Sequence, residues 1–150
     1  MDIPLRTHAT TTRGRTAPLR YSRTWDTGVS GIGEARDAVA ALLARACPAP
    51  GRRPVQDAQL VVSELVTNAA KHAPGPCALG LELLPGATEL RITVTDTSRE
   101  PPRRRPPDPR RIGGHGLNLV KMLARSLEVT RLPHGKRVTA TVPLVPATAG

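Results

Sequence analysis

Proline and glycine occur 16 and 13 times in this chain of 150 residues, and their positions divide it into short segments. Pro48, Pro50 and Gly51 form one break, Pro74-Gly75-Pro76 forms a second, and five prolines lie within residues 97–112. Proline lacks a backbone N–H and clashes with the preceding helical turn, so no regular helix runs through these places. The chain is therefore restricted to elements of moderate length, and its size fits one domain.

The segments between the breaks have clear periodicities. Apolar residues three and four apart predict helices, and strict alternation, as in Leu90, Ile92 and Val94, predicts a strand with one buried face. The predicted elements are, in order, a strand at 21–25, helices at 31–46 and 54–73, a hairpin of 77–84 and 89–95, a helix from about 117, and a hairpin of 127–131 and 137–143. Their order predicts an α+β fold, a two-layer sandwich with a mixed, mostly antiparallel sheet covered by helices on one face.

The positive charge is concentrated in two segments. The formal net charge is +10, and residues 1–24 and 97–112 contribute +4 each, so the remaining chain is nearly neutral. Trp25 and Tyr21 are the only aromatic residues, too few to stack single-stranded bases. The composition therefore argues against nucleic-acid binding as the main function and leaves it open only as a role for these two segments. Residues 1–20 are expected to form a disordered basic leader.

Neither the cysteines nor the apolar segments point to export or to a membrane. Cys47 and Cys77 are far apart in the sequence and form no CxxC motif. The chain starts without an apolar signal region, and no apolar run approaches the roughly 18 residues of a membrane span. We therefore expect a reduced cytoplasmic protein with no membrane partner.

Three polar residues lie on one stripe of the second predicted helix. Glu64, Asn68 and His72 are spaced four residues apart and therefore stack along a single face. They can form a solvated face, or they can form a metal–phosphate site. In the second case Asn68 offers a hard oxygen ligand to Mg²⁺, and Glu64 orients or deprotonates a nucleophile.

Two later features could also contact a nucleotide. Asp96 ends a strand and is either an ordinary turn residue or an acceptor that selects the amino group of adenine. The run from Gly113 to Gly116 precedes a helix and is either a flexible joint or a loop whose N–H groups bind phosphate. It matches neither the P-loop nor the Rossmann pattern.

The order of these parts resembles the Bergerat-fold ATP-binding superfamily shared by gyrase, histidine kinases and MutL. The resemblance is strongest to its stand-alone branch, the anti-sigma-factor serine kinases, and extends from Trp25 to Pro143. Residues 63–72 (SELVTNAAKH) resemble the N-box of that branch. Asp96-Thr97-Ser98 takes the place of the first glycine box, and residues 113–120 (GGHGLNLV) resemble the second.

The resemblance implies a role for each matching residue. Residues 21–145 would be a histidine-kinase-like ATP-binding domain with its lid at about 97–112, followed by a tail at 146–150. Glu64 would be the catalytic base, Asn68 would bind Mg²⁺ and Asp96 would bind the adenine amino group. The other positions implied to contact ATP are His72, Ser98, Gly114, His115, Gly116 and Leu117.

Three positions depart from the superfamily pattern. Ser98 replaces the first glycine of D-x-G-x-G, as is typical of this branch, and Glu100 replaces the second. Arg137 stands where a threonine hydroxyl would help to bind adenine. The changes at positions 100 and 137 are expected to weaken nucleotide affinity.

The resemblance implies a kinase that phosphorylates a small anti-sigma-factor antagonist, binds a sigma factor or both, and so controls transcription. Homodimerisation is common in this branch and is left open. One alternative keeps the fold without kinase activity, as a nucleotide-gated or nucleotide-free binding regulator. A histidine-kinase catalytic domain is disfavoured, because no helical dimerisation segment with a phosphoacceptor histidine precedes the domain.

Overall fold

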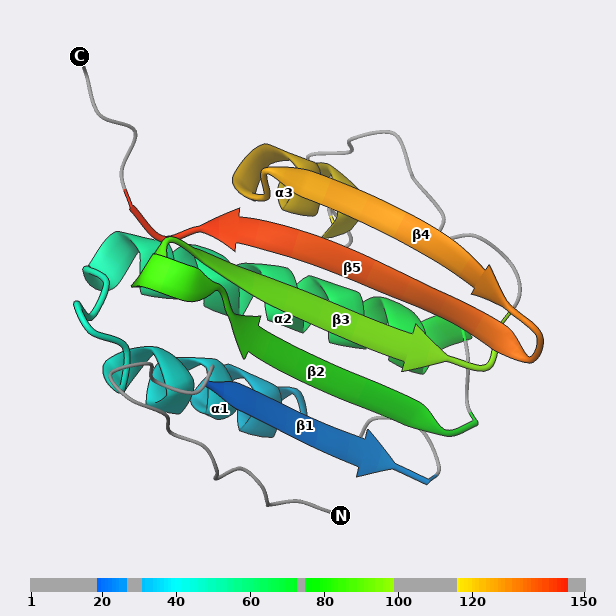
Figure 1. Ribbon diagram of the computed structural model, residues 1–150. Helices are drawn as coiled ribbons and strands as arrows, with labels where there is room; N and C mark the ends of the chain where they lie inside the picture. The colour runs from blue at the N-terminus through cyan, green and yellow to red at the C-terminus, as the bar shows by residue number, and fades with distance from the viewer. Residues whose placement is uncertain (1–18, 27–30, 73–74, 99–115, 146–150) are drawn as a thin grey trace.

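A computed structural model describes residues 19–26, 31–72, 75–98 and 116–145. These residues form a five-stranded antiparallel sheet in the order β1-β2-β3-β5-β4, with the helices on one face (Figure 1). The elements are β1 (Arg20–Trp25), α1 (Ile32–Ala44), α2 (Arg52–His72), β2 (Cys77–Leu83), a 3₁₀ turn (Pro85–Ala87), β3 (Glu89–Asp96), α3 (Gly116–Leu123), β4 (Ser126–Leu132) and β5 (Gly135–Pro143).

The predicted two-layer α+β sandwich is confirmed, and each element lies within about two residues of its predicted bounds at nearly every end. Pro54 lies in the first turn of α2, where a missing N–H costs no helical hydrogen bond. The helix predicted at 31–46 ends earlier, at Ala44. Every described strand pair is antiparallel, so the sheet of these residues is not mixed.

The core lies between the helices and one face of the sheet. Alternate residues of β2 and β3 are buried, and α2 contributes a continuous apolar stripe between them and its neighbouring helices. Burying one such side chain contributes about 1.5–3 kcal/mol. The buried residues of the α2 stripe are Ala58, Val61, Val62, Leu65, Val66 and Ala69.

Several predicted features lie outside the described residues. They are the leader except its last two residues, positions 99–112 of the lid, Gly114, His115 and the tail. β1 begins at Arg20 and so takes up the end of the segment predicted as leader. Among the described residues, no helix combines the length and the apolar character that crossing a membrane requires.

Candidate nucleotide-binding site

Glu64 and Asn68 lie on the flank of α2 that is turned away from α1. The other flank contacts α1, because Gln59 donates a hydrogen bond to the main-chain oxygen of Arg36 (3.1 Å) and the Arg36 guanidinium donates one to Ser63 Oγ (3.4 Å). A helix turns by about 100° per residue, so Asn68 points about 140° away from Ser63. The flank with Glu64 and Asn68 therefore faces the side where α3 packs against α2 (Figure 1).

Glu64 and Asn68 are half-buried, yet neither makes a side-chain hydrogen bond or ion pair with another described residue. Both side chains keep part of their surface open, so their polar atoms can contact water or a ligand. This partial burial is compatible with the predicted ligand-binding flank as well as with a solvated face. His72 is the last residue of α2, and its side chain lies outside the described part of the structure.

The C-terminal end of α2 and the C-terminal end of β3 lie at the same end of the sheet, as measured along the strands. β2 begins at Cys77, soon after α2 ends, and runs antiparallel to β3, which ends at Asp96 (Figure 1). Asn68, in the last two turns of α2, therefore lies toward the sheet end that carries Asp96. The fold brings these two predicted site residues to one end of the molecule.

A row of helix-facing residues crosses the sheet at this end. Trp25 pairs with Cys77, and Asp96 pairs with Lys136, which in turn pairs with Arg131. The pairing of Ala78 with Thr95 places Cys77 next to Asp96 in the same register. Asp96 and Lys136 continue the buried alternation of their strands, so both side chains turn toward the helices.

Asp96 and Lys136 form a buried ion pair. The Lys136 ammonium donates to both carboxylate oxygens of Asp96, at 3.1 Å to Oδ1 and 3.0 Å to Oδ2. The Ser98 amide donates to the same Oδ1 at 2.9 Å. The two charged side chains are only 3% and 4% exposed. This carboxylate is therefore desolvated, oriented by three hydrogen bonds, and paired with a cation.

Gly135 allows the two strands to come this close. A Cβ atom at position 135 would overlap the main-chain oxygen of Asp96. Glycine avoids the overlap because it has no side chain. The two-residue turn at Pro133 and His134 follows directly from Leu132, so Lys136 is already the second residue of β5.

The pKa of the Cys77 thiol reflects the burial and the charges of this row. The pKa of Cys77 is raised from 9.0 to about 11, mainly by burial and further by the Asp96 carboxylate, while the Lys136 ammonium opposes the rise. A pKa near 11 keeps this side chain a neutral thiol at physiological pH. Cys77 is therefore a packing residue beside the ion pair, and an unreactive one.

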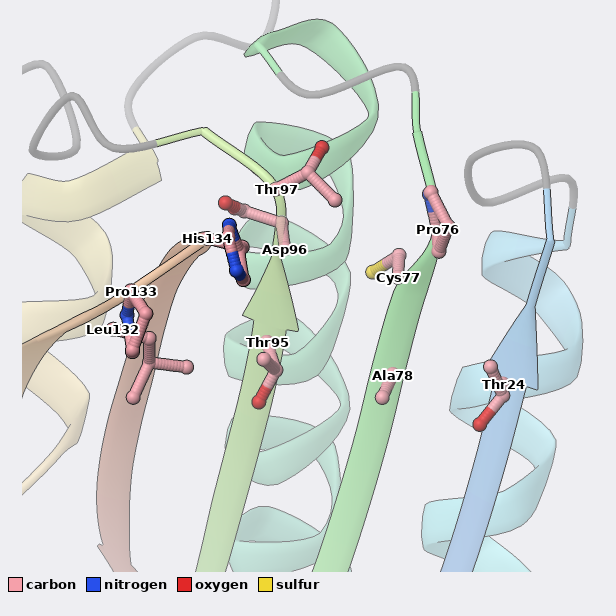
Figure 2. Close-up of a pocket in the computed structure, with 10 residues that line it drawn as sticks. All are labelled: Thr24, Pro76, Cys77, Ala78, Thr95, Asp96, Thr97, Leu132, Pro133 and His134. Atoms are coloured by element: carbon pink, nitrogen blue, oxygen red, sulfur yellow. The ribbon is translucent and has the colours of Figure 1, made fainter.

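A cavity of about 350 Å³ opens at the same end of the sheet, on the face without helices. Thr24, Ala78 and Thr95 line it, and in Figure 2 they project in front of the sheet while α2 lies behind it. The turn of Leu132, Pro133 and His134 forms another wall. Cys77, Asp96 and Thr97 line it as well, so the cavity borders the row that holds the buried ion pair, although no residue of α2 lines it.

Sequence reasoning missed Lys136 and placed Arg137 toward the adenine. Arg137 pairs with Thr95, is exposed, and alternates with the buried Lys136 and Val138, so it lies on the helix-free face. The predicted strand begins at residue 137, so Lys136 falls in the predicted turn and its alternation with the buried residues of the strand is hidden. The alternation of Lys136 with Val138, Ala140 and Val142 is the signal that identifies the buried lysine.

The helix that follows the glycine-rich run begins at Gly116. Leu117 is buried in the core, which anchors the first turn of α3. α3 ends close to the start of β4, at the far end of the sheet, so its N-terminus points back toward the Asp96 end. A helix N-terminus favours anions such as phosphate, as the sequence predicted for this loop.

The side chain of Asn68 is a chemically suitable ligand for a magnesium ion. The amide oxygen is a hard ligand, and Mg²⁺ usually takes one or two protein oxygens and completes its shell with phosphate and water. Within the described residues no three His, Cys, Asp or Glu side chains cluster as a metal site. The residues present are therefore compatible with an ion that arrives together with a phosphate ligand.

Comparison with known proteins identifies the family. Residues 29–142 match the family described as histidine kinase-like ATPase domain. The chain belongs to this family. The resemblance to the histidine-kinase-like ATP-binding superfamily is thereby confirmed, and with it an ATP-binding fold. No curated protein matches the sequence significantly.

Among solved structures, the RsbU and RsbW domains of Rv1364c from Mycobacterium tuberculosis share the fold, with 21% identity and a TM-score of 0.60. That match covers 88% of this chain and 33% of the other. A histidine kinase domain of the blue-light activated kinase EL346 from Erythrobacter litoralis is 26% identical, with a TM-score of 0.44, covering 75% and 59% of the two chains. The chain thus spans a third to three-fifths of these proteins.

Proposed function

We propose that this protein is a cytoplasmic anti-sigma-factor-type serine/threonine kinase. In this proposal it binds ATP with Mg²⁺, phosphorylates a small anti-sigma-antagonist protein, and controls transcription through protein–protein binding with that antagonist or a sigma factor. Membership of the histidine kinase-like ATPase family supports ATP as the bound nucleotide. The fold shared with a structure that contains an RsbW domain is consistent with the branch.

One observation carries the proposal. The half-buried Glu64 and Asn68 share the α2 flank that faces α3, and the C-terminal end of that helix lies at the same sheet end as the buried Asp96 carboxylate. A nucleotide lying along this flank would meet an acceptor for its base at one position and an oxygen ligand for its metal at another. Neither residue type is required there by packing.

The residues divide the chemistry between them. Bound Mg²⁺, held by the Asn68 amide oxygen, would neutralise charge on the phosphates. Glu64 would accept the proton of the attacking serine or threonine hydroxyl as its oxygen bonds to the γ-phosphorus and the bond to the departing ADP breaks. Positioning and electrostatic stabilisation supply most of the rate enhancement in such transfers.

The other proposed contacts surround the phosphates and the base. Ser98 supports Asp96 through its amide, and Gly116 opens the helix whose N-terminus favours phosphate. His72, Gly114, His115 and Leu117 complete the proposed set. The arginines of the lid at 97–112 supply positive charge for the γ-phosphate or for an acidic protein partner.

Titration calorimetry with millimolar Mg-ADP and Mg-ATP tests the nucleotide site. We expect binding by the wild type and at least tenfold weaker Mg-dependent binding by Asn68→Ala. Gln56→Ala, an exposed change on the same helix away from the flank, serves as the matched control. No binding by the wild type, or equal binding by Asn68→Ala, contradicts the proposal.

Phosphoryl transfer is tested separately. Partners are recovered from the source cell with and without Mg-ATP, and their phosphorylation sites are mapped. We expect Glu64→Gln to keep ADP affinity within a few-fold and to reduce transfer by at least a hundredfold. Transfer by Glu64→Gln at the wild-type rate excludes Glu64 as the base. The molecular mass in solution decides whether the protein is a homodimer.

A second candidate function is a regulator without kinase activity, gated by nucleotide or independent of it. The observation that favours it is the engagement of both Asp96 oxygens by Lys136, which leaves less of the carboxylate for a base. This candidate predicts partner binding that is unchanged in Glu64→Gln and no transfer in either protein. Glu64-dependent transfer to a recovered partner excludes it.

A further inference from the structure

We propose that the cavity on the helix-free face is a second binding site, which takes a small organic carboxylate with an apolar body. Binding of this ligand requires no nucleotide, so the site is additional to the proposed function. The cavity has a volume of about 350 Å³, within the range of about 300–1,000 Å³ that is usual for small-molecule sites. It is lined from the ends of β1, β2 and β3 and from the turn between β4 and β5 (Figure 2).

The cavity combines apolar surface with hydroxyl groups. Apolar surface comes from Ala78, Leu132 and Pro133, and the hydroxyls belong to Thr24, Thr95 and Thr97. None of the three hydroxyls makes a hydrogen bond with another described residue. A threonine hydroxyl can both donate and accept, so all three remain available to a ligand. Apolar walls with a few free polar groups are typical of sites that bind small organic molecules.

Arg137 supplies a positive charge beside the cavity. It is exposed on the same face and lies opposite Thr95, and such opposite residues have Cβ atoms only about 4.5–5.5 Å apart. Its guanidinium makes no ion pair with another described residue, whereas Arg20 and Arg91 on the same face both contact Glu82. A guanidinium binds a carboxylate through two parallel N–H···O bonds. An anionic group at the edge of the cavity would therefore meet a cation that no described carboxylate engages.

The balance of charge favours a carboxylate over a phosphate. Asp96 also lines the cavity, but its side chain turns toward the helices and is paired with Lys136. Its charge is thus already balanced, and the Arg137 guanidinium is left to balance one further negative charge. A phosphate monoester carries about −1.5 to −2 at pH 7, so part of its charge would remain unbalanced near Asp96. A carboxylate carries a single charge and matches the single guanidinium.

Calorimetric titration of the full chain with 2-naphthoate and with the neutral 2-naphthamide, which has nearly the same shape, tests the inference. We expect the wild type to bind the carboxylate about fivefold more tightly than the amide, or better. Arg137→Leu should remove this preference, because it deletes the charged hydrogen bonds and leaves the apolar contacts. Thr95→Val, which keeps the side-chain shape but removes a hydroxyl of the cavity, should weaken both probes about twofold or more. Arg91→Leu, the same change at an arginine that Glu82 already engages, should leave both affinities unchanged.

Each part of the proposal has an outcome that overturns it. Equal affinity of the wild type for the two probes, or a preference unchanged in Arg137→Leu, excludes recognition of the carboxylate by Arg137. Unchanged affinities in Thr95→Val place the probes outside the cavity. Tighter binding of 2-naphthyl phosphate than of 2-naphthoate contradicts the choice of a carboxylate, and no binding of either naphthalene probe at millimolar concentration contradicts the site itself. The titrations with Mg-ADP are separate, so none of these results decides the proposed nucleotide site.

Discussion

Two ion-pair groups on neighbouring strands have almost the same geometry and opposite surroundings. Lys136 contacts Asp96 at 3.0 Å with both side chains at most 4% exposed, whereas Arg91 and Arg20 contact Glu82 at 3.0 and 3.2 Å with side chains 30% to 67% exposed. The first group faces the helices, and the second lies on the helix-free face. Distance alone would rank the two groups as equals.

The difference lies in what each charge loses when its partner is removed. A surface charge regains water, so an exposed pair contributes about 0–1 kcal/mol. A buried charge has no water to regain, so removing one partner costs about 3–5 kcal/mol even where the whole pair adds little net stability. Removing one partner of the buried pair should therefore be costly, whereas removing one partner of the exposed group should cost little. The following variants test this contrast, from the largest expected effect to the smallest.

Asp96→Ala should reduce the free energy of unfolding by about 3–5 kcal/mol, because it leaves the Lys136 ammonium buried without a partner. Urea denaturation followed by the fluorescence of Trp25, the single and buried tryptophan, measures the loss. Asp37→Ala, an exposed change on α1, is the control. The double variant Asp96→Ala/Lys136→Met should lose less than the sum of the single variants. A loss below 1 kcal/mol in Asp96→Ala would make the two ion-pair groups equivalent.

Gly135→Ala should cost about 1–3 kcal/mol, because its Cβ would overlap the backbone of β3 and force the strands apart at the ion pair. Gly33→Ala, in the first turn of α1 where a Cβ meets no atom within 4 Å, should stabilise the protein by less than about 1 kcal/mol. Thermal unfolding of both variants gives the comparison. Equal effects of the same sign would refute the close approach at Gly135.

The free energy of unfolding should fall more steeply with pH in the wild type than in Cys77→Ala between pH 9 and 11. The unfolded thiol loses its proton near its ordinary pKa of 9.0, whereas the folded thiol, with a pKa raised to about 11, keeps it. Since the folded state then binds more protons, stability decreases as pH rises through this window. Tyr21, whose pKa burial also raises, contributes equally to both proteins. Parallel urea titrations with identical slopes would contradict the burial of Cys77 beside Asp96.

Glu82→Gln should cost no more than about 1 kcal/mol although it removes the contacts to two arginines. The cost should shrink further in 1 M salt, because salt screens exposed charges. Chemical denaturation with urea at low and high salt measures it. A loss as large as that of Asp96→Ala would show that burial does not separate the two groups.

The sequence predicted the fold well because its signals were local and strong. Proline and glycine set the segment ends, and the alternation in β3 and the apolar stripe of α2 fixed which faces are buried. Asp96, Glu64 and Asn68 could be singled out because polar residues interrupt those patterns. Element type depends on such local periods, so the predicted and observed orders agree.

The parts that escaped prediction depend on register across strands. Whether Lys136 or Arg137 faces Asp96 is decided by a two-residue turn, and one residue more or less reverses the faces. The overlap that a Cβ at Gly135 would produce involves Asp96, nearly 40 residues earlier in the chain. The alternation of Lys136 with Val138 indicates which face Lys136 takes, but neither its pairing with Asp96 nor the close approach at Gly135 leaves a local signature, so the ion pair required three-dimensional coordinates.

The strand order has a consequence for solubility. β1 and β4 lie at the two ends of the sheet, where unpaired N–H and C=O groups can recruit another chain. Charged side chains occupy both strands, Arg20 and Arg23 on β1 and Glu128 and Arg131 on β4. Pairing two copies edge to edge would bring these charges together and strip them of water. The charged outer strands thus discourage uncontrolled sheet extension and keep the protein dispersed in solution.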